Sequence, residues 1–77
     1  MARVHVLYWR DIPSVVRAGD VKRQLPDWFQ QEIDRVAMEQ GLAGSDEYLE
    51  RWEWRDYGER EGSDAQAVDQ VVDELTQ

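Results

Sequence analysis

The chain contains no cysteine, a single histidine, two prolines and no long hydrophobic run. Without cysteine it has neither disulfides nor thiolate zinc sites, two common supports of a small fold. No segment approaches the roughly 20 apolar residues of a membrane-spanning helix. The amino terminus also lacks the charged lead, apolar stretch and cleavage site of a secretory signal. We therefore expect no membrane association and a cytoplasmic location.

The residues also assemble no recognisable reactive centre. His5 lies within a predicted strand and has no second histidine to share a triad or a metal site. There is no glycine-rich phosphate loop. We expect no catalytic residue, no metal ligand and no cofactor, and hence a non-enzymatic protein. Carboxylates are abundant, so a small ligand-binding or acid/base enzyme domain that uses them near tryptophans is the alternative.

Length and aromatic content describe a small domain with a thin stability margin. The 77 residues predict one domain over 1–77. Four tryptophans indicate dense aromatic packing in place of covalent supports. Self-association, as a homodimer, is left open as a further source of stability.

Charge is distributed unevenly along the chain. Residues 1–44 carry six basic and six acidic groups, whereas residues 45–77 carry eleven acids against three arginines, which accounts for the net charge of −8. Nucleic-acid affinity depends on neutralising phosphates. An acidic half therefore predicts a protein that does not bind nucleic acid.

Hydrophobic periodicity predicts strands at Arg3–Trp9 and around Trp52–Tyr57, and helices over Pro26–Gln40 and after Ser63. Residues 14–25 form either a hairpin around Gly19-Asp20 or an irregular arm. Ser63 and Gln66 have the spacing of a capping box. Alternation in the later strand favours Trp52 and Trp54 in the core. The predicted core contains Phe29, Ile33, Val36, Trp52, Trp54, Val68, Val72 and Leu75.

These elements predict an α+β fold in two layers, with a small, mostly antiparallel sheet of three to four strands and two helices on one face. The first strand is apolar on both faces, since Val4, Val6 and Tyr8 alternate with His5, Leu7 and Trp9. Two helices cover only one face, so one of these rows stays uncovered. We expect this apolar sheet face and the adjoining aromatic corner to bind a protein partner or a second copy of the chain. The candidate partner-binding residues are Leu7, Trp9, Asp11, Pro13 and Trp28.

Two resemblances bear on function. The stretch from Val21 to Phe29 resembles the strand-to-helix junction of ribbon-helix-helix repressors, which implies DNA binding as a remote alternative. Those repressors continue into a second helix, whereas the next predicted element here is the strand with Trp52 and Trp54.

The second resemblance covers most of residues 4–54. Tyr8-Trp9-Arg10-Asp11-Ile12-Pro13, then Gln24-Leu25-Pro26 and the Trp52-x-Trp54 pair, are similar to the motifs of a small bacterial family labelled "virulence factor". The family includes short proteins and modules of longer proteins associated with virulence regulation. The resemblance implies a regulatory or interaction role and brings no catalytic residues with it.

Overall fold

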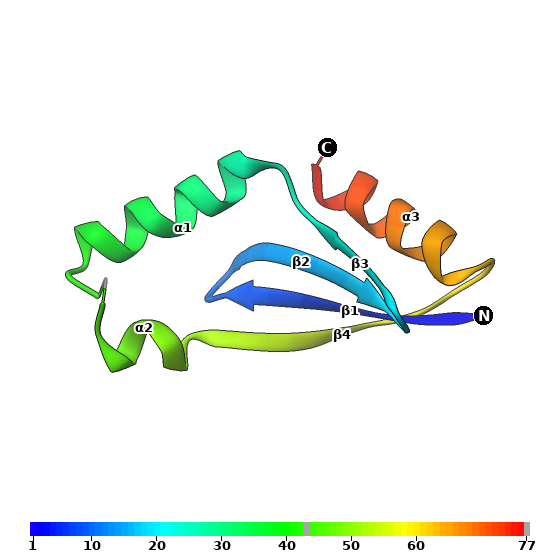
Figure 1. Ribbon diagram of the computed structural model, residues 1–77, viewed down its shortest axis with the longest axis horizontal. Helices are drawn as coiled ribbons and strands as arrows, with labels where there is room; N and C mark the ends of the chain where they lie inside the picture. Colours follow the sequence, from blue (N-terminus) through cyan, green and yellow to red (C-terminus); the bar gives the residue numbers. More distant parts are fainter. Residues whose placement is uncertain (43, 77) are drawn as a thin grey trace.

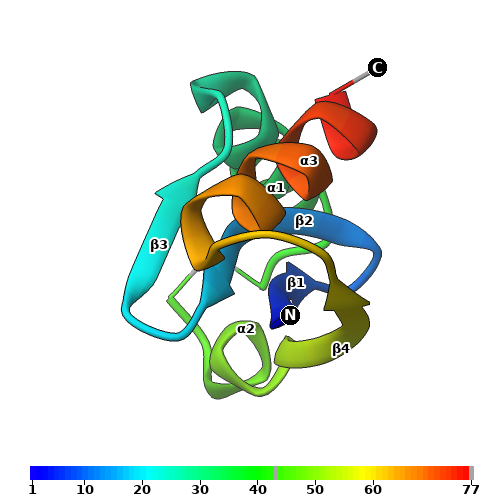
Figure 2. The same cartoon turned by 90° about the vertical axis from the view of Figure 1, so that its right-hand side faces the viewer.

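The fold is built on a four-stranded antiparallel sheet with the spatial order β3-β2-β1-β4. The computed structural model describes residues 1–42 and 44–76. Its strands are β1 (Ala2–Trp9), β2 (Ile12–Ala18), β3 (Val21–Gln24) and β4 (Trp52–Arg60). The helices of these residues are α1 (Asp27–Glu39), α2 (Asp46–Glu50) and α3 (Asp64–Thr76). Since α1 and α3 lie on the same side of the sheet (Figures 1 and 2), the predicted α+β architecture is confirmed.

Residues 12–24 form a hairpin within the sheet rather than an arm folded over it. Ala18 pairs with Val21, which leaves Gly19 and Asp20 as a two-residue turn. Gly19 has a φ of 57°, a left-handed conformation that glycine adopts without steric cost. The hairpin alternative was therefore the correct one. Because β3 pairs with β2 of its own chain, it differs from the strand of a ribbon-helix-helix repressor, which pairs between chains.

The helix ends follow their local sequence signals. The Ser63 amide donates to Gln66 Oε1 at 2.9 Å, and the Gln66 amide donates to Ser63 Oγ at 3.2 Å. This is the predicted capping box, and it begins α3. After α1, the Leu42 amide donates to the Ala37 carbonyl at 2.8 Å, and Gly41 has a φ of 69°. These two features complete a Schellman stop, so Gly41 ends the helix as predicted.

The core consists of two clusters. The larger lies between the sheet and the helices α1 and α3, and contains Ala2, Val4, Val6, Tyr8, Val16, Ala18, Leu25, Phe29, Ala67, Val68 and Val71. The smaller lies at the end of β1, where Trp9 packs with Ile33, Ala37 and Leu42. In Figure 1 the carboxyl half of α1 extends beyond the β1–β2 hairpin, which is why α1 serves both clusters.

The position of Trp54 corrects the predicted core. Its side chain is 43% exposed, whereas Trp52 is half-buried against the smaller cluster. Trp54 pairs with Leu7 of β1, so both side chains point away from α1 and α3. On the helix-facing side, β4 presents Arg55 and Tyr57 instead. Alternation had identified the two faces of β4 correctly, and Trp52 does pack against a core cluster, but the placement of Trp54 in the core was wrong.

Candidate interaction surface

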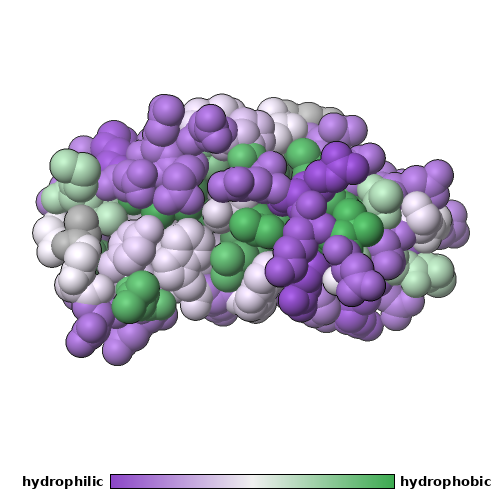
Figure 3. Space-filling model, viewed as in Figure 1, coloured by the Kyte–Doolittle hydropathy of each residue, from purple (hydrophilic) through white to green (hydrophobic). Residues whose placement is uncertain are grey.

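The sheet face opposite α1 and α3 carries a row of apolar side chains. Leu7 lies directly across from Val15 on β2 and from Trp54 on β4, so the three point the same way. Leu7 and Val15 are half-buried. Figure 3 shows hydrophobic surface near the middle of the molecule, over β1 and β2, bordered by hydrophilic atoms. We call this surface the outer face and define it by His5, Leu7, Val15, Arg17, Lys22 and Trp54.

Arg17 and Trp54 partly close the outer face. The guanidinium carbon of Arg17 lies 4.7 Å from the centre of the Trp54 ring. Arg17 is on β2 and Trp54 is on β4, so their contact passes over the intervening β1 near Leu7. A cation–π contact at an exposed site contributes about 0.5–1 kcal/mol. The pair explains why Leu7 is half-buried although α1 and α3 lie on the other side of the sheet.

The outer face carries two cations, Arg17 and Lys22, within an acidic protein. Among the described residues, neither Arg17 nor Lys22 forms an ion pair. By contrast, Arg3 at the margin pairs with Asp56 and with Glu59. The net charge of the chain is −8, with many acids in and before α3. Two unneutralised cations beside an apolar row favour an acidic partner.

The turn between β1 and β2 forms a second feature, which we call the hairpin corner (Trp9–Pro13). Arg10 has a φ of 56°, unusual for a residue with a side chain. Arg55 stabilises this turn, because its Nη2 donates to the Arg10 carbonyl at 2.7 Å. The same atom lies 3.6 Å from Asp11 Oδ1, and the Arg55 guanidinium carbon lies 4.3 Å from the Tyr8 ring centre. The motif Tyr8–Pro13 therefore builds a turn clamped by one arginine from β4.

Tyr8 completes the clamp on the helix-facing side. Its hydroxyl shares a hydrogen bond with the hydroxyl of Tyr57. Burial and then this hydrogen bond raise the pKa of the Tyr8 phenol well above its ordinary value. A tyrosine whose pKa is raised stays protonated at neutral pH, so it is not poised to act as a base. The arrangement is a structural link between β1 and β4.

The structure disperses the predicted partner-binding residues. Leu7 belongs to the outer face, and Pro13 is half-buried in the hairpin corner. The Asp11 side chain is 98% exposed. Trp28 is 56% exposed on α1, on the other side of the sheet, where its ring stacks on Phe29 with centroids 3.8 Å apart. These four residues do not form one continuous site.

Trp9 corrects the expectation that the aromatic corner is accessible. Its side chain is fully buried, and its Nε1 donates to the Tyr48 carbonyl at 2.9 Å. The carboxyl half of α1 supplies Ile33 and Ala37 to the cluster around the ring, and α2 supplies Tyr48. No signal in the strand itself indicates this burial, because the covering residues are distant in sequence. The accessible tryptophan of the sheet is Trp54, which sequence reasoning had placed in the core.

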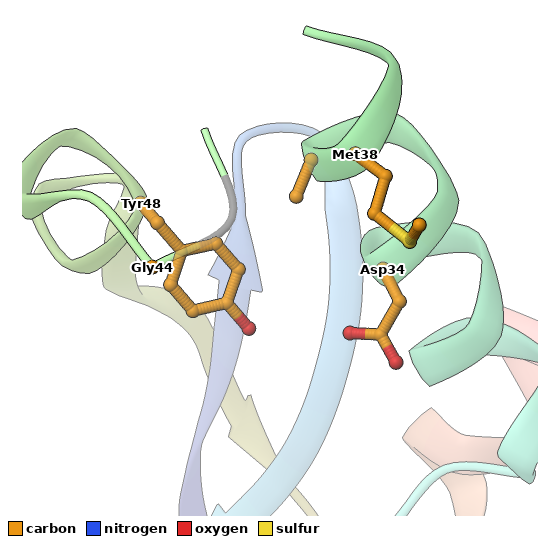
Figure 4. Close-up of a pocket in the computed structure, with 5 residues that line it drawn as sticks. Asp34, Met38, Gly44 and Tyr48 are labelled. Atoms are coloured by element: carbon orange, nitrogen blue, oxygen red, sulfur yellow. The ribbon is translucent and has the colours of Figure 1, made fainter. Parts of the chain in front are cut away.

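Two pockets formed by described residues lie away from the outer face. One, of about 310 Å³, lies between α1 and α2, where Tyr48 faces Asp34 and Met38 (Figure 4). The other, of about 510 Å³, is an open acidic hollow along α3 that includes Asp69 and Asp73. As lined by described residues, neither joins a tryptophan to converging carboxylates. That combination was the feature expected of a ligand-binding or acid/base site.

Two further findings concern metal binding and membrane-spanning helices. Within residues 1–42 and 44–76, no cluster of three or more histidine, aspartate or glutamate side chains is placed to hold a metal ion. None of the helices in these ranges combines the length and the apolar character needed to cross a membrane.

The fold and surface define a class: a small α+β domain with an open antiparallel sheet, one covered face and one accessible face. A family profile described as "Virulence factor" matches residues 7–77. The chain therefore belongs to this virulence factor family, as the motif Tyr8–Pro13 and the pair Trp52 and Trp54 had indicated. No curated protein and no solved structure shows significant similarity to the chain.

Proposed function

We propose that this virulence factor family member is a non-enzymatic protein-interaction module whose outer face binds an acidic segment of a partner protein. The observation that carries the proposal is the apolar row of Leu7, Val15 and Trp54. Arg17 and Lys22 flank this row and form no ion pair with any residue that the structure describes. In a chain of net charge −8, this surface is the part that an acidic partner approaches with least repulsion. Apolar contacts then supply affinity, while the two cations supply orientation.

The Arg17–Trp54 contact gives the surface a means of accommodating a partner. Both side chains are long, and they lie over the sheet rather than within its core. An acidic side chain that draws Arg17 away from the ring uncovers Leu7 and the indole face together. Tryptophan and arginine are also the residue types that dominate binding energy at protein interfaces.

The proposal is tested by NMR titration of the isotopically labelled protein with two matched peptides. One peptide alternates acidic with apolar residues, and the other has lysine at each acidic position. We expect the acidic peptide alone to shift the amide signals of Leu7 and Val15 and the indole signal of Trp54. Equal binding of both peptides, or shifts confined to the pocket near Asp34 and Tyr48, would contradict the proposal.

A matched pair of variants separates a specific contact from overall charge. Lys22 and Arg23 are neighbours on β3 but point to opposite faces, and Arg23 lies 3.4 Å from Asp69 of α3. Lys22→Glu is expected to weaken binding of the acidic peptide by about tenfold. Arg23→Glu, on the helix-facing side, is expected to weaken it much less. Similar losses in both variants would indicate long-range charge alone and overturn the outer-face assignment.

A further inference from the structure

The sheet has one long edge that no described element covers. β4 contributes the edge beside β1, and its nine residues pair on one side only. α3 contacts β1, β2 and β3, while α2 contacts β4 next to it in the chain. Figures 1 and 2 show β4 at the margin of the molecule, with nothing beyond it. Open edges of this kind are templates for pairing with another strand.

Only the first part of β4 is suited to such pairing. The register with β1 shifts between Arg3 and His5, so that Tyr57 and Gly58 together face Val4, and Gly58 has a φ of 81°. This is a β-bulge, a device that bends an edge strand and obstructs further pairing. Residues 52–56 precede the bulge and keep a regular register. The other edge, β3, has four residues and includes Lys22 and Arg23.

We propose that β4 pairs antiparallel with β4 of a second copy of this chain, about a two-fold axis centred on Trp54. In this register Trp54 lies opposite Trp54 of the second copy, and each Glu53 lies opposite an Arg55. A centre on Glu53, Arg55 or Asp56 instead places two identical charges directly opposite each other, which is destabilising. A centre on Trp52 places residues 53–56 opposite residues 48–51, which precede β4. The centre on Trp54 is therefore the one that pairs the regular part of the strand with complementary charges.

The side chains required for this pairing are accessible. Glu53 is 63% exposed and Arg55 is 39% exposed, and within one chain the two approach only to 4.0 Å. Across the two-fold axis they become direct cross-strand neighbours, a closer and better-aligned arrangement. The two Trp54 rings, each 43% exposed, lose contact with water together. Aromatic cross-strand pairs are among the stabilising pairs of antiparallel sheets.

This dimer goes beyond the proposed function and shares Trp54 with it, so the two are distinguished by substitution of Glu53, which is not part of the outer face. Pairing joins two four-stranded sheets into one continuous sheet and places the two outer faces side by side. Glu53 and Arg55 pair with Tyr8 and Val6, so they project on the helix-facing side. Substitution of Glu53 therefore disturbs the dimer without replacing a residue of the outer face, whereas Arg55 also stabilises the hairpin corner through the Arg10 carbonyl.

A charge-exchange experiment tests the register. Sedimentation equilibrium from micromolar to millimolar concentration is measured for the wild type, for Glu53→Arg, and for Glu53→Arg combined with Arg55→Glu. The single variant places like charges opposite each other twice, and we expect it to weaken dimerisation by about tenfold or more. The double variant restores opposite charges and is expected to bind more tightly than the single variant, although it also loses the hydrogen bond from Arg55 to the Arg10 carbonyl. Glu61→Arg, in the turn before α3, makes the same charge change away from the edge and serves as the control.

The cysteine-free sequence offers a second measurement that does not depend on the ion pairs. Trp54→Cys introduces one thiol per chain, and a two-fold axis at this position brings two such thiols within reach of a disulfide. We expect rapid oxidation to a covalent dimer, and much slower oxidation for the exposed position in Trp28→Cys. The proposal would be overturned if the protein were a monomer at every concentration. It would also be overturned if Glu53→Arg left the dimerisation affinity unchanged, or if Trp54→Cys and Trp28→Cys oxidised at equal rates.

Discussion

The two faces of the sheet are made by the same strands but are covered in different ways. On the helix-facing side, Val4, Val6 and Val16 have no exposed surface and pack under α1 and α3. On the outer face, Leu7 and Val15 are neighbours of these residues but are half-buried, and the Arg17–Trp54 contact passes near Leu7. Apolar side chains on one face thus stabilise the fold, whereas those on the other face remain available to a partner.

The largest difference in stability between the two faces is expected when two tryptophans are replaced. Trp9→Ala removes a fully buried ring and its hydrogen bond to the Tyr48 carbonyl, and it should lower the free energy of unfolding by about 3–5 kcal/mol. Trp54→Ala removes an exposed ring and should cost less than about 1 kcal/mol. Urea denaturation followed by circular dichroism measures both. Equal costs would mean that the outer face is as well packed as the core.

A smaller effect is expected from two adjacent valines on β2. Val16 is fully buried and Val15 is half-buried on the outer face. Val16→Ala deletes two buried methyl groups and should cost about 2–3 kcal/mol, from the transfer free energy and the cavity together. Val15→Ala should cost less than half as much. Because the residue type is the same, a reversed order in urea denaturation would show that the faces are wrongly assigned.

Acidification tests the attachment of α3, which covers the helix-facing side. Arg60 at the end of β4 donates to Glu74 of α3 at 3.0 Å, and this hydrogen bond lowers the pKa of Glu74. A carboxyl group with a lowered pKa stabilises the folded state when ionised, and this contribution is lost as the pH falls below about 4.5, the ordinary glutamate value. Glu74→Gln should therefore lose less stability on acidification than the wild type. Glu61→Gln is the control and should behave like the wild type.

The smallest expected effect concerns duplex DNA. The outer face carries only a few cations in a chain of net charge −8, so we expect no measurable binding at physiological salt by fluorescence anisotropy. Salt-sensitive binding at micromolar protein would contradict this expectation. It would also mean that Arg17 and Lys22 bind phosphate groups of DNA rather than an acidic protein segment.

Local signals predicted the elements of this fold well. The capping box of Ser63 and Gln66, the stop at Gly41 and the turn at Gly19 each depend on neighbouring residues, so they can be recognised in sequence. β4 was harder to predict, since the strand expected around Trp52–Tyr57 continues through a bulge to Arg60. The residues of the candidate interaction surface were predicted only in part from the sequence. Leu7 was identified, whereas Trp54 and Arg17 were missed.

The sequence by itself determined the class of fold, the helix limits and the presence of two apolar rows on β1, because these depend on periodicity and on contacts within a few residues. The tertiary structure decided which side of β4 faces the helices, since this follows from its register with β1. It also decided that Trp9 is enclosed, because α1 extends past the hairpin and α2 supplies Tyr48 to the cluster around the ring. Trp9 was expected to be accessible and is buried, whereas Trp54 was expected to be buried and is accessible. This outcome depends on contacts between residues about 40 positions apart. The periodicity of a single strand carries no information about such contacts.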